Sequence, residues 1–327
     1  MEKMTSLSKQ LFDGTLVTIL AEDEGCQIIQ AKNETGEGLM SSFTVFPGIR
    51  LMYNDFHMDS CESRFQAEVA MFNVNHCREG RLEQEVTGGA YLYLGAGDFT
   101  FDTGNTGNSH VEFPLRHYHG ICLSFVLEEA VQSLSRLVYE FPVDLYALKR
   151  KYLNGKPIFI MHNESGLERI FSELYTVPGH IRLAYFRVKV LELLLYLDAL
   201  ELPTRGDERP YFYKSHVEKA KALHHFMVSR LDKHYTLEEL SRRFDFPMTA
   251  MKKCFKNVYG DSIFSYMRTY RIHQSARLLR ERKDMSVMDI ASYSGYDSPG
   301  KFSTAFKEIM GLPPLAYRKK SVGLDKK

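Results

Sequence analysis

The chain has 327 residues, 44% of them hydrophobic and 25% charged, which is enough to fill the cores of two domains. Its net charge of +1 conceals an asymmetry. Residues 211–327 hold 23 Lys and Arg against 12 Asp and Glu, whereas the remainder holds 19 Lys and Arg against 29 Asp and Glu. A basic C-terminal third is typical of a protein that binds a polyanion. Five scattered cysteines without a Cys-x-x-Cys pair argue against a disulfide framework or a structural zinc site. The sequence shows neither the apolar core of a signal peptide nor an apolar membrane span, which predicts a cytoplasmic protein with no membrane partner.

Residues 39–127 are the first region with a regular pattern. Short apolar runs such as FTVFPGIRLMYNDF, AYLYLGAGDFTF and GICLSFVL are separated by Gly, Asn and Asp, which is typical of strands joined by turns. The pattern predicts a small barrel or sandwich. From Leu127 onward the spacing of apolar residues becomes helical.

The strongest helix of this half runs from Ile181 to Leu200. Its apolar residues follow the three-and-four spacing of an a/d seam, and they are Leu183, Phe186, Val190, Leu193 and Leu197. Such a seam either pairs with a second copy, as a dimerisation segment, or packs on the core of its own domain. Fewer than three heptads leave both interpretations open.

A change of composition marks a domain boundary. Residues 202–214, LPTRGDERPYFYK, contain two prolines, a glycine and several charges. We therefore expect a first domain at 1–201, a linker at 202–214, a second domain at 215–320 and a basic tail at 321–327.

The second domain contains one unit twice, namely a short helix, a tight turn and a helix that carries lysines. In the first copy Thr236 and Glu239 have the spacing of a capping box, and Pro247 marks the turn. Helical periodicity places Met251 and Phe255 on the buried face of the following helix. The opposite face, which suits a DNA groove, carries Thr249, Lys252, Lys253 and Lys256.

A long helix separates the two copies. It follows Gly260, with Asp261 as its expected N-cap, and about 19 residues at 1.5 Å each span roughly 28 Å, close to the 34 Å of one DNA turn. In the second copy Ser286 and Asp289 resemble a capping box, and Ser298 followed by proline starts the lysine-bearing helix. The residues that this copy leaves for DNA are Ser298, Gly300, Lys301, Thr304 and Lys307.

Several motifs with fixed spacings occupy the C-terminal domain. They are RxxxxxxLL (Arg271 to Leu279), DIAxxxGYxSxxKFxxxFKxxxG (Asp289 to Gly311) and PxxYR (Pro314 to Arg318). In these residues the chain resembles the AraC/XylS family of transcription regulators. The resemblance implies a double helix-turn-helix domain that binds double-stranded DNA, an N-terminal cupin-like barrel that binds an effector, and contact with RNA polymerase.

The first copy departs from the family pattern at its turn. Asp245 and Pro247 stand where the family usually has Gly and Ser. Three stretches (FPMTAMKKCFKNVYGDSIFSYMR, NHCREGRLEQE and YFRVKVLELLL) resemble the PchR-like subgroup of siderophore regulators. This finer resemblance implies a siderophore as the effector.

Candidate effector contacts lie in the N-terminal domain, and they are Arg50, Tyr53, Arg78, Arg81, Tyr91, His117 and His119. Arg78 and Arg81 flank Gly80 in a predicted charged turn, and arginine forks suit anionic groups. His117 and His119 alternate onto one strand face. No further ligand follows them at the spacing of a cupin metal triad, so we expect neither metal nor cofactor. Surface charges and hydrogen-bonded histidines are the alternative interpretation.

Together these patterns predict an α+β protein with a β-rich, cupin-like N-terminal barrel, a helical dimerisation segment and an all-α C-terminal domain. We expect a homodimeric regulator, an activator, that responds to a small molecule. In one alternative the N-terminal domain only dimerises or binds a protein partner. In another it is a cupin-type enzyme on a DNA anchor, although the sequence contains no H-E-x-x-H, G-x-S-x-G or Walker motif and we expect no catalytic residues.

Overall fold

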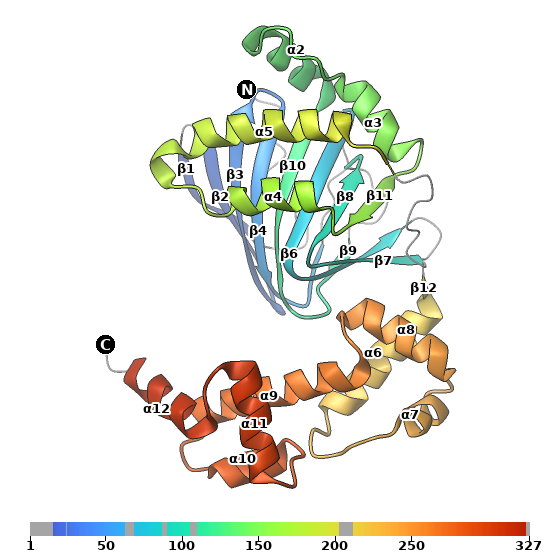
Figure 1. The fold of residues 1–327 in the computed structure, drawn as a ribbon, viewed down its shortest axis with the longest axis vertical. Coiled ribbons are helices and arrows are strands. Elements are labelled where there is room, and N and C mark those ends of the chain that lie inside the picture. Colours follow the sequence, from blue (N-terminus) through green and yellow to red (C-terminus); the bar gives the residue numbers. More distant parts are fainter. Residues whose placement is uncertain are drawn as a thin grey trace. The chain divides into compact units, whose positions relative to one another are not determined.

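The computed structural model describes residues 16–23, 25–62, 69–86, 90–104, 110–202 and 212–324. The chain forms two compact units, Met1–Tyr211 and Phe212–Lys327 (Figure 1). Residues 203–211 of the predicted linker and residues 325–327 of the predicted tail lie outside the described residues. In the part of the chain that is described, no helix is both long and apolar enough to cross a membrane.

The N-terminal unit is built on a curled antiparallel sheet, a half-barrel. Its strands pair in the order β1-β2-β3-β4-β10-β6-β7, β8 joins β6 to β11, and β5 and β9 pair beside β6. The strands are β1 (Leu16–Asp23), β2 (Cys26–Asn33), β3 (Gly36–Phe46), β4 (Ile49–His57), β5 (Ser60–Glu62), β6 (Met71–Val86), β7 (Ala90–Gly95), β8 (Asp98–Asp102), β9 (His110–Glu112), β10 (Tyr118–Val126) and β11 (Ile158–His162). The predicted β-rich region is therefore confirmed as a curled sheet, and its likeness to a cupin barrel stays a prediction.

Helices α4 and α5 lie on one face of this sheet, with α2 and α3 beyond its edge (Figure 1). The helices are α2 (Leu127–Leu137), α3 (Leu145–Leu153), α4 (Ser165–Leu174) and α5 (Arg182–Ala199), with a 3₁₀ turn η1 at Gly179–Ile181. Alternating strand residues such as Leu51, Leu123 and Phe125 meet α4 and α5 in one apolar core.

The a/d seam of α5 packs inside this core. Phe186, Val190, Leu193 and Leu197 are fully buried there, and Leu183 is half-buried. These residues therefore do not form an exposed dimerisation surface, because the sheet of their own unit supplies their apolar partner. Of the two interpretations of the seam, packing on the unit's own core is the one observed.

The C-terminal unit is helical apart from the two-residue β12 (Phe212–Tyr213). Its helices are α6 (Lys214–Val228), α7 (Leu237–Arg243), α8 (Met248–Tyr259), α9 (Ile263–Glu281), α10 (Val287–Tyr293), α11 (Pro299–Met310) and α12 (Pro314–Leu324). The pairs α7–α8 and α10–α11 are the two predicted helix-turn-helix units, and α9 runs between them (Figure 1).

Local sequence signals explain where these helices start and stop. Both predicted capping boxes are present, since Thr236 and Ser286 each accept from the backbone of the third helical residue, whose carboxylate bonds back to the cap. The recognition helices α8 and α11 have 12 residues each and end at glycines with left-handed backbone. One expectation was wrong: Ser262, not Asp261, is the N-cap of α9, and Asp261 instead bonds the Ser265 hydroxyl.

A buried arginine connects the two halves of this unit. Arg271 of α9 donates to the carbonyl oxygens of Leu231 (3.0 Å) and Lys233 (2.6 Å) and contacts Nδ1 of His234 (3.2 Å). Nε2 of His234 donates in turn to the carbonyl oxygen of Gly295 (2.7 Å), in the turn of the second helix-turn-helix unit. At that turn a Cβ on Gly295 would lie 2.7 Å from the Leu231 carbonyl oxygen, so only glycine fits.

His224 makes the stability of the C-terminal unit depend on pH. It stacks on Tyr259 with ring centroids 4.3 Å apart, and burial lowers its pKa to about 4. An unfolded histidine titrates near about 6.5, so between these values the unfolded chain binds a proton that the folded chain rejects. The contribution of neutral His224 to the free energy of unfolding is therefore complete above about pH 6.5, and it is lost as the pH falls toward about 4.

We therefore expect the free energy of unfolding of this unit to fall by up to about 3 kcal/mol from neutral to acid pH through His224 alone. Urea unfolding of the natural chain and of His224→Phe at several pH values measures it. The variant should show a shallower fall. Equal falls in both proteins would mean that the folded chain accepts the proton at His224.

Candidate nucleic-acid interface

The outer face of α8 carries the side chains that the sequence assigned to a DNA groove. Thr249, Lys252, Lys253 and Lys256 are all exposed. On the opposite face Met251 and Phe255 are fully buried. The helix is thus anchored by its apolar face and presents three cations and a hydroxyl outward. Among the described residues, none of these lysines belongs to an ion pair.

The outer face of α11 is similar but carries less charge. Gly300, Lys301, Thr304 and Lys307 are exposed, whereas Ser298 is half-buried. The Ser298 hydroxyl accepts from the Lys301 backbone as the N-cap of α11, so its oxygen is already engaged. Phe302 and Phe306 hold the helix on the core that it shares with α9.

Both turns contain a residue with left-handed backbone two residues after the first helix ends, although the residue types differ. Asp245 has the left-handed backbone (φ 43°) that Gly295 has in the second copy (φ 79°). Pro247 precedes α8 without any side-chain cap, whereas Ser298 caps α11. Aspartate is among the few residues that tolerate left-handed backbone, so the departures from the family pattern leave the first unit intact.

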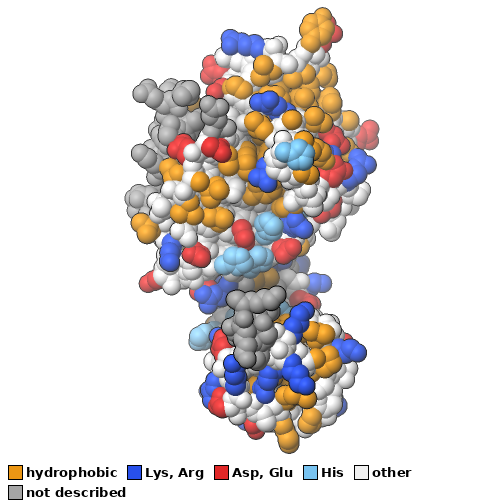
Figure 2. Space-filling view, turned by 90° about the vertical axis from the view of Figure 1, so that its left-hand side faces the viewer, with side chains coloured by type: hydrophobic (Ala, Val, Ile, Leu, Met, Phe, Trp, Pro, Cys, Tyr) orange, Lys and Arg blue, Asp and Glu red, His pale blue; other side chains and the backbone are white. Residues whose placement is uncertain are grey.

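Basic side chains recur over the C-terminal unit. Figure 2 shows several Lys and Arg side chains on the drawn face of this unit. The excess of 23 Lys and Arg over 12 Asp and Glu in residues 211–327 gives the unit the charge that attraction to phosphate requires.

The seven candidate effector residues of the N-terminal unit do not form one site, although Tyr53, Arg78 and His119 all lie against the Tyr175 ring. Tyr53, on the helix-covered side of β4, donates its hydroxyl to the Leu174 carbonyl oxygen (2.6 Å), and Arg78 lies over the Tyr175 ring at 4.5 Å. Arg50 is three residues from Tyr53 and therefore points to the other face of β4. Tyr91 is half-buried on β7, away from both.

The predicted charged turn at Gly80 was wrong, since residues 71–86 form one continuous strand, β6. Gly80 has a φ of 83° and lies close to a shift in the register between β6 and β10, at His119. This irregularity is a β-bulge and not a turn. Arg81 is buried, with its guanidinium near the Tyr93 ring and Gly95. Sequence reasoning missed the bulge because the turn residue Gly serves both structures.

The face of the sheet opposite α4 and α5 carries a buried polar cluster, which we define as Asn73, Asn75, Thr100, Asp102 and Ser124. The two amides donate to Asp102 at 2.7 Å each, and the Ser124 hydroxyl donates to Asn73 at 2.6 Å. Burial raises the pKa of the Asp102 carboxyl. Arg50 pairs across the strands with Ser124, and its Nε is buried without a partner among the described residues.

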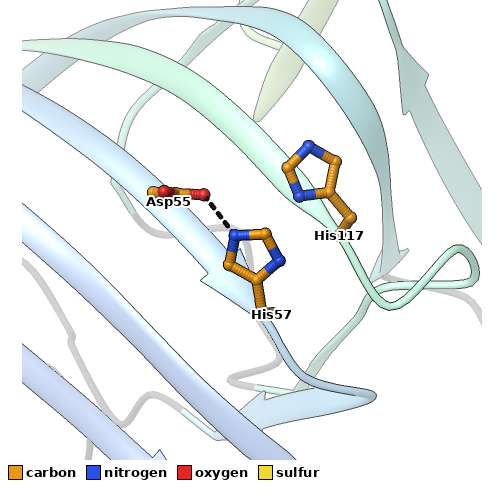
Figure 3. A group of neighbouring side chains, drawn as sticks. All are labelled: Asp55, His57 and His117. Carbon is orange, nitrogen blue, oxygen red and sulfur yellow. Dashed lines mark ion pairs between the residues drawn. The ribbon is translucent and has the colours of Figure 1, made fainter. Parts of the chain in front are cut away.

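The two predicted histidines lie near one end of the same sheet. His119 of β10 is directly opposite Asp55 of β4, and His117 precedes the strand. The His117 ring lies 4.8 Å from that of His57, whose Nε2 is 3.0 Å from an Asp55 oxygen (Figure 3). Sequence reasoning missed Asp55 and His57, although their D-x-H spacing places both on one strand face.

Comparison with known proteins supports the same assignment for the C-terminal unit. Residues 240–320 match the family model described as a helix-turn-helix domain. The chain is similar to the transcriptional regulator ExsA of Pseudomonas aeruginosa, 32% identical over 32% of this chain and 36% of ExsA. It is also similar to a putative AraC-like transcription regulator of Streptomyces lividans, 33% identical over 26% of this chain and 28% of that protein.

Some relatives are similar to more of the chain than the C-terminal unit. The virulence regulon transcriptional activator VirF of Yersinia enterocolitica is 26% identical over 57% of this chain and 68% of VirF. Among solved structures, fatty-acid-bound ToxT of Vibrio cholerae covers 83% of this chain and 94% of ToxT, at 13% identity and a TM-score of 0.31. A TM-score this low places no constraint on function.

These comparisons support the AraC/XylS type of helix-turn-helix domain that the motifs resemble. The matched part is about a third of the length of ExsA and about two thirds of that of VirF. The finer resemblance to siderophore regulators stays a prediction.

Proposed function

On the premise that the C-terminal unit is an AraC-type DNA-binding domain, we propose that the chain is a sequence-specific transcription regulator. Helices α8 and α11 enter two adjacent major-groove segments on one side of the duplex. The observation that carries this proposal is the repetition of one geometry: two 12-residue helices, each buried on its apolar face and exposed on its Lys and Thr face, joined by a 19-residue helix. At 1.5 Å per residue, α9 spans roughly 28 Å, near the 34 Å repeat of DNA.

The two helices contribute unequally to recognition. A lysine can donate to a phosphate oxygen or to the O6 and N7 atoms of guanine. Thr304 offers one hydroxyl, and Gly300 allows the backbone to approach the DNA closely. With three lysines, α8 is the stronger contact, and α11 adds affinity with little base discrimination. By analogy with VirF, whose name describes an activator, the bound regulator activates transcription through contact with RNA polymerase.

A selection experiment tests this function directly. The full chain, mixed with a library of random duplexes, should enrich one sequence with two short specific segments about one helical turn apart. Enrichment of no sequence at moderate salt would contradict a DNA-binding function, and a single segment would contradict the use of both helices.

Two lysine variants then separate base reading from phosphate binding on the selected DNA. Lys253→Ala should weaken binding and relax specificity at one base pair, by about 1–3 kcal/mol. Lys256→Ala should weaken binding to every sequence and reduce the slope of affinity against salt. Fluorescence anisotropy against the selected site and single-base variants measures both effects. Equal, sequence-independent losses would mean that Lys253 contacts phosphate.

We also propose that the N-terminal unit binds a small anionic effector through Arg50. Support comes from the half-buried position of Arg50 beside the polar cluster and from its Nε, which has no partner among the described residues. A guanidinium with free donors suits a carboxylate or phenolate. Ferric siderophores carry such groups, and the resemblance in sequence makes them the first class to test. An effector acts only through different affinities for the DNA-competent and incompetent states.

A thermal-shift screen of the full chain with ferric siderophores, free carboxylates and neutral sugars checks this proposal. A ligand should raise the melting temperature of the natural chain and of Arg116→Met, an exposed control, but not of Arg50→Met. If no anionic compound shifts the melting temperature, the N-terminal unit serves dimerisation or a protein partner instead.

We also propose that the chain forms a homodimer through the exposed face of α5, and not through the buried a/d seam. Val188 is 62% exposed, Leu195 45% and Ile181, just before the helix, 42%. Together with exposed Ala184 they are spaced three, four and seven residues apart along the chain, so they share one face of the helix. An exposed apolar stripe of this spacing suits pairing with its own copy.

We expect Val188→Glu to raise the dimer dissociation constant by about tenfold or more, since a carboxylate would be buried in the pair. Leu137→Glu, at an exposed position of α2, is the matched control and should leave the dissociation constant unchanged. Sedimentation equilibrium measures the constant. A natural chain that stays monomeric at micromolar concentration, or equal effects from both variants, rules out this stripe.

A further inference from the structure

We propose that Asp55, His57 and His117 bind a divalent transition-metal ion at the end of β4. One ligand atom from each residue lies within 4.8 Å of the others. Figure 3 shows Asp55 and His57 projecting from β4 toward the His117 ring, which comes from the segment entering β10. The proposal does not depend on the DNA-binding function.

The backbone already holds these three residues in place. Asp55 and His57 lie two residues apart and so share one face of β4, which pairs with β3 at Leu39 and Glu37. The carbonyl oxygen of His117 accepts a hydrogen bond from Arg81 N–H at 3.0 Å. The strands β3, β4 and β6 therefore fix the Cα positions of the three residues. Only their side chains need to move when an ion binds.

The side-chain distances are compatible with a small adjustment. Zinc binds nitrogen and oxygen at about 2.0–2.2 Å, which places tetrahedral ligand atoms about 3.3 Å apart. His57 Nε2 is already 3.0 Å from Asp55 Oδ1. The remaining separations, up to 4.8 Å, close by about 1.5 Å. Rotation of these partly exposed side chains supplies such a movement.

The two ring nitrogens of His117 have different surroundings. Its Nδ1 is shielded from solvent and has no hydrogen-bond partner among the described residues. Its other nitrogen, Nε2, is 3.8 Å from a Glu79 oxygen. A metal-bound histidine commonly donates its second N–H to a carboxylate, which orients the ring. We therefore assign Nδ1 to the ion; the Glu79 oxygen would have to approach Nε2 by about 1 Å to accept its N–H.

The donor set determines the class of ion. Two imidazoles and one carboxylate suit Zn²⁺ and neighbouring first-row divalent ions, and no sulfur donor takes part. Three protein ligands leave a position open for water or an anionic ligand. The sequence predicted no metal because no third ligand follows His117 and His119 along the chain. The structure supplies Asp55 and His57 from the neighbouring strand, 60 residues earlier than His117 in the case of His57.

Isothermal titration of the untagged full chain with ZnCl₂, after treatment with a chelator, tests the site. We expect one saturable site per chain. Separate His57→Ala, His117→Ala and Asp55→Asn variants should each weaken binding by about tenfold or more. His180→Ala removes an exposed histidine of the same unit outside the cluster and should leave binding unchanged.

Titration with Co²⁺ gives a second measurement, because the visible spectrum reports the ligands. Nitrogen and oxygen ligation gives d–d bands without the thiolate charge-transfer band that a site made from the five cysteines would produce. Circular dichroism checks that each variant is folded. No saturable binding by the natural chain, unchanged binding in folded cluster variants, or a thiolate band would each overturn the proposal. DNA binding would be unaffected by such a result.

Discussion

The DNA-binding unit depends on the buried guanidinium of Arg271. From α9 it holds two carbonyl oxygens of the segment after α6, and His234 of that segment holds the turn of the second helix-turn-helix unit. Charge-assisted bonds of this kind are stronger than neutral ones, and leaving their acceptors buried and unpaired costs about 1–3 kcal/mol each. One side chain thus links α9 to the segment between α6 and α7 and, through His234, to the turn that precedes α11.

The two faces of the sheet in the N-terminal unit differ in their buried polar groups. The face under α4 and α5 is apolar and includes the a/d seam of α5. The other face holds Asp102 in a hydrogen-bonded polar cluster beside Arg50. Burial of such groups costs free energy unless each is hydrogen-bonded, and the Nε of Arg50 has no hydrogen-bond partner among the described residues. This unpartnered donor is the physical basis for proposing an effector there.

Local signals made most of the C-terminal unit predictable. Capping boxes, helix-ending glycines and helical periodicity placed the lysine faces of α8 and α11 from sequence alone. Contacts between distant segments were not predictable in this way. The α5 seam was compatible with two partners until the sheet was seen beneath it. Likewise, Asp55 and His57 meet His117 only because β4 pairs with β10, and no local pattern specifies which strands pair.

The rigid placement of two recognition helices one groove repeat apart is the central claim. Affinity for a selected operator, measured before and after about 5 base pairs are inserted between its two segments, tests it most directly. Half a turn rotates the second segment to the far side of the duplex. We predict that binding falls to the level of a single segment. Unchanged affinity would show that the two units are not held together, and it would contradict the account.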